Sequence, residues 1–216
     1  VALKISAIGA NGELLDSSTI EINAPIVYSI NLSEIFKGFK AKNYLIEFFS
    51  EKNLFIPFPA VIISHQGKDF CNVVHSYNRV INDIFEDDQI NKTQVSEASF
   101  DVNITSKYDT FFNLSSGISS IDNKYLKLSY EKDKKKITKS LKVNVPRLSF
   151  KSFYLSKIFN KNLEGGTVRI KQPKQNLFFG RLFAGKINKK TKAFSANHSY
   201  YDVSKNKEYF SSTKSF

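Results

Sequence analysis

The chain repeats itself over a long stretch, and this repeat constrains its fold more than any other feature. When the sequence is compared with itself at an offset of 123 residues, positions 29–80 align with positions 152–203 without a gap, and 12 of the 52 aligned residues are identical. The identities form three clusters: Leu-Ser-x-Ile-Phe from 32 and 155, Asn-Leu-Phe from 53 and 176, and His-Ser-Tyr from 75 and 198. Two copies of one folding unit are therefore expected.

The match extends upstream of the three clusters. Leu-Lys-Ile-Ser at 3–6 corresponds to Leu-Lys-Leu-Ser at 126–129, and a two-residue difference in length falls where a turn is expected. Turns tolerate such differences. The repeat cores are therefore 3–80 and 126–203.

A connector separates the two cores. Its segments 98–105 and 110–114 have the composition of strands, and a long connector without structure would be unusual in a compact protein. We expect these strands to complete the sheets of the first unit. The predicted domains are residues 1–105 and residues 106–216.

Short runs of Phe, Tyr, Ile and Val, separated by turn residues, predict strands throughout the chain. The predicted strands are 2–8, 17–23, 26–31, 44–50, 56–64, 70–77, 98–105, 124–130, 137–145, 148–154, 166–171, 177–187 and 193–200. Many short strands favour a sandwich or barrel. The predicted fold is all-β, an internal duplication of two β-sandwich-like units packed as one pseudo-symmetric molecule.

The Leu-Ser-x-Ile-Phe segments are expected to form single helical turns that close one end of each unit. Leu32, Ile35 and Phe36 are apolar at helical spacing and are expected in the core. Ser33 is expected to cap the turn.

The His-Ser-Tyr triplets are the first candidate site, because two of the three histidines occupy equivalent positions in the copies. Alternate residues of a strand share a face, which predicts two rows that point inward: Cys71, Val73, His75 and Tyr77, and Phe194, Ala196, His198 and Tyr200. One interpretation is structural, with each imidazole satisfying a loop carbonyl. The other is a ligand or acid–base site, and His75 and His198 would meet if the units packed across a pseudo-twofold axis.

Motifs for other chemistry are missing from the sequence. It contains no His-x-His, Cys-x-x-Cys or His-Glu-x-x-His pattern, although zinc requires three or four such ligands. It also contains no Gly-x-Ser-x-Gly elbow. We therefore predict no metal, no cofactor and no catalytic residues.

The charge is uneven along the chain, which carries a net charge of +12. Residues 1–108 hold 9 basic and 13 acidic residues, whereas residues 109–216 hold 23 and 7. Only four of the 32 basic residues are Arg, and nucleic-acid recognition relies on Arg forks. The sequence therefore disfavours nucleic acid as a partner and points to an anionic glycan or protein bound by the basic second half, with self-association as a further possibility. No apolar run reaches the roughly 20 residues that span a bilayer.

The copies differ most after Asn-Leu-Phe, where the second continues with Phe179 and Arg181 and has Lys186 nearby. These three residues are candidates to stack on a sugar or contact an anion. The leading hypothesis is a non-catalytic binding or structural protein that recognises carbohydrate or an anionic surface component. The alternatives are a metal-dependent or His-based enzyme that uses the His-Ser-Tyr positions, and a virion or surface-assembly component.

Overall fold

The computed structural model describes residues 1–24, 26–49, 61–75, 78, 97–173, 177 and 180–201. Within these residues, fourteen strands form antiparallel sheets, and the two helices are one turn long. The prediction of an all-β fold is confirmed. The strands are β1 (Ala2–Ile8), β2 (Leu14–Glu21), β3 (Asn43–Phe49), β4 (Ile62–Gly67), β5 (Phe70–His75), β6 (Glu97–Ile104), β7 (Tyr108–Ser115), β8 (Ile121–Lys132), β9 (Lys135–Val145), β10 (Phe150–Tyr154), β11 (Leu163–Lys171), β12 (Phe183–Asn188), β13 (Phe194–His198) and β14 (Tyr200–Tyr201); the helices are α1 (Leu32–Ile35) and α3 (Leu155–Phe159).

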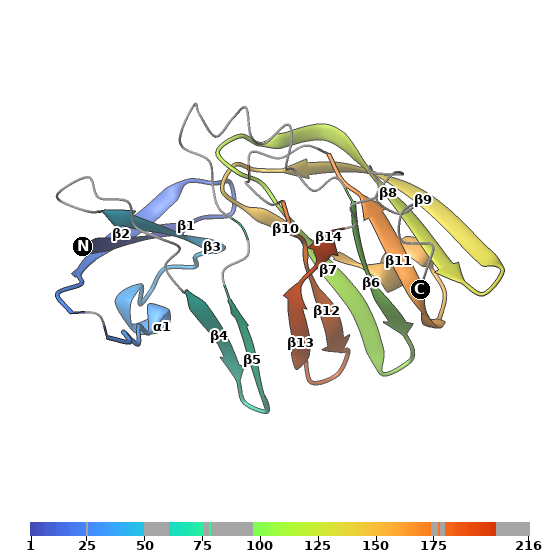
Figure 1. Cartoon of the computed structure of the whole chain (residues 1–216), viewed down its shortest axis with the longest axis horizontal. Coiled ribbons are helices and arrows are strands. Elements are labelled where there is room, and N and C mark those ends of the chain that lie inside the picture. The colour runs from blue at the N-terminus through green and yellow to red at the C-terminus, as the bar shows by residue number, and fades with distance from the viewer. Residues whose placement is uncertain are drawn as a thin grey trace, which may run out of the picture.

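The second half of the chain forms a β-sandwich (Figure 1). One sheet has five strands in the order β14-β6-β11-β8-β9, and the other has four in the order β10-β7-β12-β13. Apolar side chains of both sheets meet in the largest core, which includes the fully buried Leu126, Leu128 and Ile170 of the five-stranded sheet and Phe112 and Leu114 of the four-stranded sheet. The alternation of apolar and polar residues along β8 and β11 therefore leaves one face of the five-stranded sheet in solvent.

The first half forms a three-stranded sheet, β2-β1-β3, whose inner face packs on α1. A separate hairpin, β4-β5, follows. Apart from β10, which has no counterpart among the described residues of the first half, the order of elements matches that of the second half: a hairpin, a one-turn helix, a strand that pairs with the first strand of the hairpin, and a second hairpin. In both halves this pairing gives the same order, β2-β1-β3 and β9-β8-β11. The arrangement is compatible with the predicted duplication.

The connector strands do not complete the sheets of the first half. β6 pairs with β11 and β14, and β7 pairs with β10 and β12, so both belong to the sandwich of the second half. Segments 98–105 and 110–114 are strands, as expected. The expectation that they pair with strands of the first half is wrong. A domain boundary after residue 105 would separate β6 from every strand with which it pairs.

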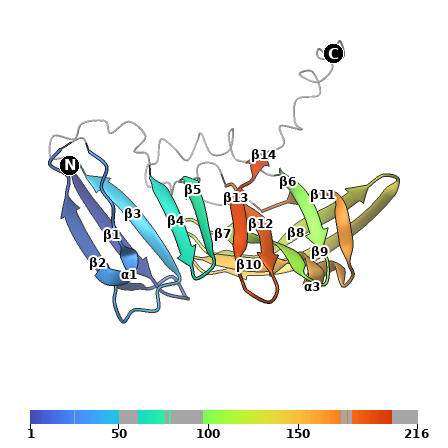
Figure 2. The same cartoon turned by 90° about the horizontal axis from the view of Figure 1, so that it is seen from below.

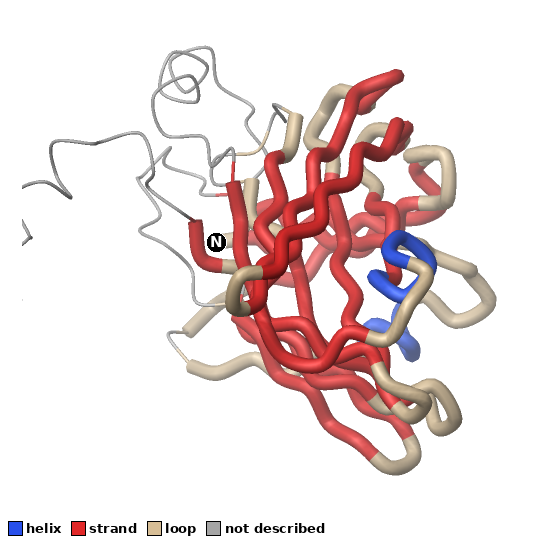
Figure 3. Tube along the Cα trace, turned by 90° about the vertical axis from the view of Figure 1, so that its right-hand side faces the viewer, coloured by secondary structure: helices blue, strands red, loops and turns tan. Residues whose placement is uncertain are grey.

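The Leu-Ser-x-Ile-Phe segments lie in the core as predicted, since Phe36, Leu155 and Phe159 are buried. The predicted cap is wrong, because the Asn31 side chain, and not Ser33, accepts the hydrogen bond from the backbone at the start of α1. In α3 the backbone and hydroxyl of Ser156 donate instead to the buried carboxylate of Asp109. Both helices lie on the same side of the molecule (Figure 3).

The two halves meet at two places. The hairpin β4-β5 lies beside β13 (Figure 2), where Val74 shares a small core with Phe111, Phe183 and Ala196 of the four-stranded sheet. At the second place, the Asn43 side chain donates to the carbonyl of Leu148 over 3.1 Å. The four-stranded sheet is thus covered at its edge by a hairpin that comes from the other half of the chain.

Candidate functional site

The boundary between β5 and β13, which we call the seam, joins positions that are 123 or 124 residues apart. The rings of Phe70 and Phe194 lie 4.9 Å apart, Ala196 donates its backbone N–H to the Asn72 side chain over 2.8 Å, and the rings of His75 and His198 lie 4.7 Å apart. These contacts advance together along both strands, so β5 and β13 run in the same direction. Neighbouring positions of the two strands are therefore related by a translation, and the histidines meet without the pseudo-twofold axis that was one way to bring them together.

His75 and His198 contact each other directly at the end of the seam. Their Nε2 atoms lie 2.9 Å apart, which is a hydrogen-bonding distance. The Nδ1 atom of His198 lies 3.2 Å from the carbonyl oxygen of Ser199. Because a carbonyl only accepts, Nδ1 of His198 carries a proton, and its Nε2 in the neutral ring accepts the hydrogen bond that His75 donates.

The environment of His198 disfavours its protonation. Burial lowers the pKa of His198 below its ordinary value of 6.5, the positive charges of Arg181 and His75 lower this pKa further, and the hydrogen bond to Ser199 acts in the opposite direction. A second proton on His198 would also turn its Nε2 into a donor that faces the donor on His75. The neutral form of His198 is therefore the one that fits the seam.

We expect acidification to weaken the fold through this group. Because the pKa of His198 is lower in the folded than in the unfolded state, the unfolded state binds more protons between the folded pKa and about 6.5, and stability falls as pH falls through that range. Urea unfolding of the wild type and of His198→Gln at about pH 7.5 and pH 5.5 measures the difference. The variant is expected to lose less stability than the wild type between the two pH values. Equal losses in both proteins would contradict the role assigned to His198.

The prediction that the rows containing the two histidines point inward is correct for β13 and wrong for β5. Ala196 is buried, as expected, whereas Val73 is 56% exposed and His75 is exposed. In β5 the inward row consists of Asn72 and Val74. His75 therefore points to the solvent face of β5, whereas His198 lies in the inward row of β13, and His75 reaches His198 from the solvent side.

Asn78 adds a contact across the seam, and Ser199 fixes the backbone next to it within the second half. Asn78 uses both ends of its amide on the backbone of Arg181, donating to its oxygen and accepting from its nitrogen, both over 2.9 Å. Ser199, the middle residue of the second triplet, is buried, and its hydroxyl accepts from the backbone of Leu182. These contacts support a structural role for most of the conspicuous residues around the second triplet.

The remaining candidates from the sequence are not brought together. Tyr77 and Phe179 lie outside the described residues, and of Tyr200 only the backbone is described, where it pairs with Ser99 in β14. Arg181 precedes β12 and lies at the seam. Lys186 lies further along, inside β12, and lines a hollow of about 350 Å³ together with Tyr108 and Phe194. The described part of the predicted Phe179, Arg181 and Lys186 group is therefore not one site.

A group of cations that the sequence reasoning missed lies on the solvent face of the five-stranded sheet. Exposed Arg169 and Lys171 of β11 lie on the same face as exposed Lys127 of β8, and Lys171 stands directly opposite Lys127. Lys142 of β9 stands opposite Tyr125, whose side chain is 56% exposed. We call these five residues the basic face. The alternation along each strand was visible in the sequence, but the register that aligns Lys127 with Lys171 was not.

Acidic residues also occur on this face: exposed Asp101 of β6 stands opposite Thr167, and Glu97 of β6 is the register partner of Lys171. Glu131 forms an ion pair with Lys136 over 2.9 Å. A hydrogen bond and the charge of Lys136, and more weakly the charge of Arg169, lower the pKa of Glu131. Glu131 is therefore paired with a cation of the neighbouring strand β9.

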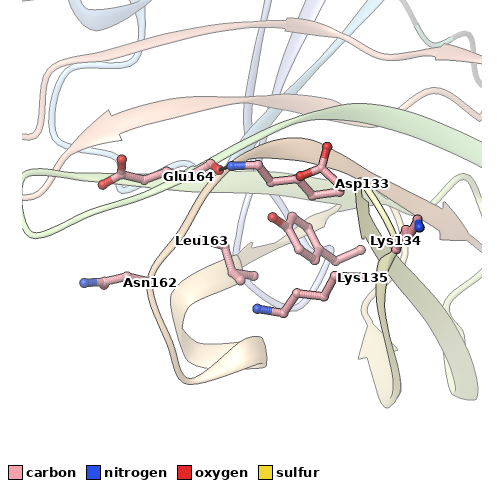
Figure 4. Close-up of a pocket in the computed structure, with 8 residues that line it drawn as sticks. Asp133, Lys134, Lys135, Asn162, Leu163 and Glu164 are labelled. Atoms are coloured by element: carbon pink, nitrogen blue, oxygen red, sulfur yellow. Dashed lines mark hydrogen bonds between the residues drawn. The ribbon is translucent and has the colours of Figure 1, made fainter.

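A hollow of about 670 Å³ opens at the same end of the sheet, between the β8-β9 turn and the loop before β11 (Figure 4). Tyr130 and Leu163 form its apolar part, and Lys135 and Asn162 line it on opposite sides. The Lys132 ammonium donates to the Glu164 carbonyl over 2.7 Å, while the carboxylate of Glu164 points away from the lysines. Tyr130 belongs to the core-facing row of β8, so this hollow opens on the other side of the sheet from the basic face.

Comparisons with known proteins do not assign a family. No family model matches the sequence, and no curated protein is significantly similar to it. The solved structure of Thermotoga maritima 1070 is similar over 50% of this chain and 96% of its own, with 9% sequence identity and a TM-score of 0.37. Within the described ranges, no three His, Cys, Asp or Glu side chains gather as metal ligands, and no helix there is long and apolar enough to cross a membrane.

Proposed function

We propose that this protein is a non-catalytic binding protein that recognises an acidic polysaccharide through the basic face of its second half. The observation that carries the proposal is the pair Lys127 and Lys171. Like charges directly opposite each other on neighbouring strands destabilise a sheet, and Arg169 adds a third cation one step along β11. An anionic ligand that bound between these cations would remove this repulsion.

The shape of the surface supports an extended ligand. Neighbouring strands lie about 4.8 Å apart and alternate residues of one strand about 6.6 Å apart, so the cations are spaced over several sugar units. Ser129, Thr138 and Ser140 lie on the same face and add hydroxyl groups that can bind sugar hydroxyls. Exposed Tyr125 offers an aromatic surface of the kind on which sugar rings pack.

The chemistry of the cations favours a polysaccharide over a nucleic acid. Lysine binds anions as a point charge, whereas base recognition in nucleic acids uses the planar Arg fork. Four of the five residues of the basic face are Lys or Tyr. Exposed charge pairs are individually weak, so binding is expected to depend on several cations at once and to weaken with salt.

Reversal of the central charges is expected to weaken binding to a polyuronate at least about tenfold. Surface plasmon resonance on immobilised polygalacturonate would compare the wild type with Lys127→Glu/Lys171→Glu. The matched control is Lys37→Glu/Lys40→Glu, which makes the same change of net charge at exposed positions after α1. Equal weakening in both variants would show an effect of net charge alone, and the proposed face would then be wrong.

Two further ligands define the class. Neutral dextran is expected not to bind, because it lacks the anionic groups that the basic face requires. Double-stranded DNA is expected to bind more weakly than polygalacturonate at the same salt concentration. DNA binding that is tighter and is lost in Lys127→Glu/Lys171→Glu would replace the glycan proposal with a nucleic-acid one.

A further inference from the structure

We propose that His75 and His198 together bind one divalent transition-metal ion, with copper or nickel preferred to zinc, and that this ion joins the two halves of the chain at the seam. The two imidazoles come from β5 and β13, which are separated by more than a hundred residues. Neutral imidazole is a good ligand for copper, nickel and zinc. The site is independent of the basic face, so each proposal stands or fails without the other.

The spacing of the two nitrogens in the metal-free pair is already close to that of two ligands on one ion. Nitrogens about 2.05 Å from one metal lie about 2.9 Å apart if they meet it at a right angle, and about 3.3 Å apart if they meet it at a tetrahedral angle. The observed separation of the Nε2 atoms is 2.9 Å. Right angles belong to square-planar and octahedral sites, which Cu²⁺ and Ni²⁺ adopt, whereas zinc prefers the tetrahedral angle.

The orientation of the rings agrees with this geometry. Two imidazoles joined head-on by a straight hydrogen bond of this length would have centroids about 5.2 Å apart. The observed centroids lie 4.7 Å apart, and the ring planes are inclined by 73°. The rings therefore meet at an angle, as two ligands on adjacent corners of a metal site do.

His198 already has the tautomer of a metal ligand, with the proton on Nδ1 and a lone pair on Nε2. Metal-binding histidines commonly donate their other ring N–H to a carbonyl or carboxylate, which fixes the tautomer, and Nδ1 of His198 makes such a contact with Ser199. In the metal-free pair His75 carries a proton on Nε2. When the metal binds, this proton leaves to solvent while Nδ1 of His75 takes one up, so the ring remains neutral and no net proton is released.

His75 is exposed, and no cluster of three metal-ligating side chains occurs in the described part of the chain, so the described residues supply two ligands to the ion. The positive charge of Arg181, which acts on His198, would also repel a metal ion bound there. The expected affinity is therefore modest, and binding requires the docked hairpin because only the folded chain brings the two nitrogens together.

Isothermal titration of the whole chain with CuCl₂, NiCl₂ and ZnCl₂ at about pH 7.5 tests the proposal. The expected result is one Ni²⁺ per chain, bound more tightly than Zn²⁺, with Cu²⁺ tightest. Either His75→Gln or His198→Gln is expected to weaken Ni²⁺ binding at least about tenfold. Copper electron paramagnetic resonance of the wild type should show two equatorial nitrogens, and one in each variant.

The chain provides two matched controls on the same hairpin. His65 is the third histidine, and its ring contacts Phe194 rather than the pair; Cys71 is an exposed thiol. His65→Gln and Cys71→Ser are expected to leave Ni²⁺ binding unchanged. Unchanged Ni²⁺ binding in His75→Gln would overturn the proposal. Loss of Ni²⁺ binding in His65→Gln or in Cys71→Ser would also overturn it. If His198→Gln does not fold, the result for His75→Gln alone is the test.

Discussion

Replacing Leu126 with Ala is expected to lower the free energy of unfolding by about 2–5 kcal/mol. Leu126 lies in β8 with none of its surface exposed, in the core between the two sheets of the sandwich. The substitution removes apolar contact and leaves a cavity, and the surrounding side chains come from both sheets, so they collapse only partly into it. Urea unfolding followed by circular dichroism measures the change.

The neighbouring residue provides the control. Tyr125 is one position earlier in the same strand, and its side chain is 56% exposed on the basic face. Tyr125→Ala is expected to change stability by no more than about 0.5 kcal/mol, because surface substitutions remove few contacts. A loss in Tyr125→Ala that equals the loss in Leu126→Ala would contradict the assignment of the two faces of β8.

The second large effect is expected at the paired glycines of β11. Gly166 has a φ of +79°, and a Cβ atom there would lie 2.6 Å from the Glu131 carbonyl oxygen and 2.8 Å from Cβ of Lys132. Gly166→Ala therefore combines the cost of the left-handed conformation, about 1–2 kcal/mol, with a clash against the backbone of β8. We expect a total loss of more than about 2 kcal/mol in urea unfolding.

Gly165 separates the two contributions. Its φ of +71° is also left-handed, but an added Cβ would meet only the end of the Lys132 side chain, at 3.5 Å. Gly165→Ala is expected to lose only the conformational cost of about 1–2 kcal/mol. Both glycines lie where the register between β6 and β11 shifts. Equal losses at the two positions would mean that β8 does not approach Gly166 as closely as the structure shows.

Local features of the fold were predictable from the sequence. The alternation along Lys139–Val145 predicted a half-buried strand, and β9 is one. The apolar spacing of the Leu-Ser-x-Ile-Phe segments predicted buried helical turns, and Phe36 and Leu155 are buried. Side-chain period and turn residues act within a few positions of the chain, which is why they could be read without knowledge of the partner strands.

Features that depend on distant partners were not predictable. β6 and β7 were expected to join the first half because they follow it in sequence, yet their partners are β11 and β12. The face of β5 was inferred by analogy with β13, but the neighbours of β5 lie across the seam, where Asn72 reaches the backbone of Ala196. Pairing register between remote strands is a property of the assembled sheet and leaves no mark in either strand alone.

The same distinction between local and distant signals applies to the two candidate sites. The identity of His75 and His198 as a related pair came from the repeat, and the structure places their rings in contact. The basic face could not be found in this way, because Lys127 and Lys171 acquire a common location only when β8 and β11 pair. The uneven charge of the two halves was the one signal that pointed towards it.

The hairpin that lies against β13 has a consequence for how the protein can be divided. β13 is the edge strand of its sheet; without residues 61–75 the backbone of Ala196 would lose its contact with Asn72, and Phe111 and Phe183 would lose the cover of Val74. Open strand edges next to apolar surface favour pairing between molecules and aggregation. The second half on its own is therefore expected to associate through this edge, although it contains the larger core.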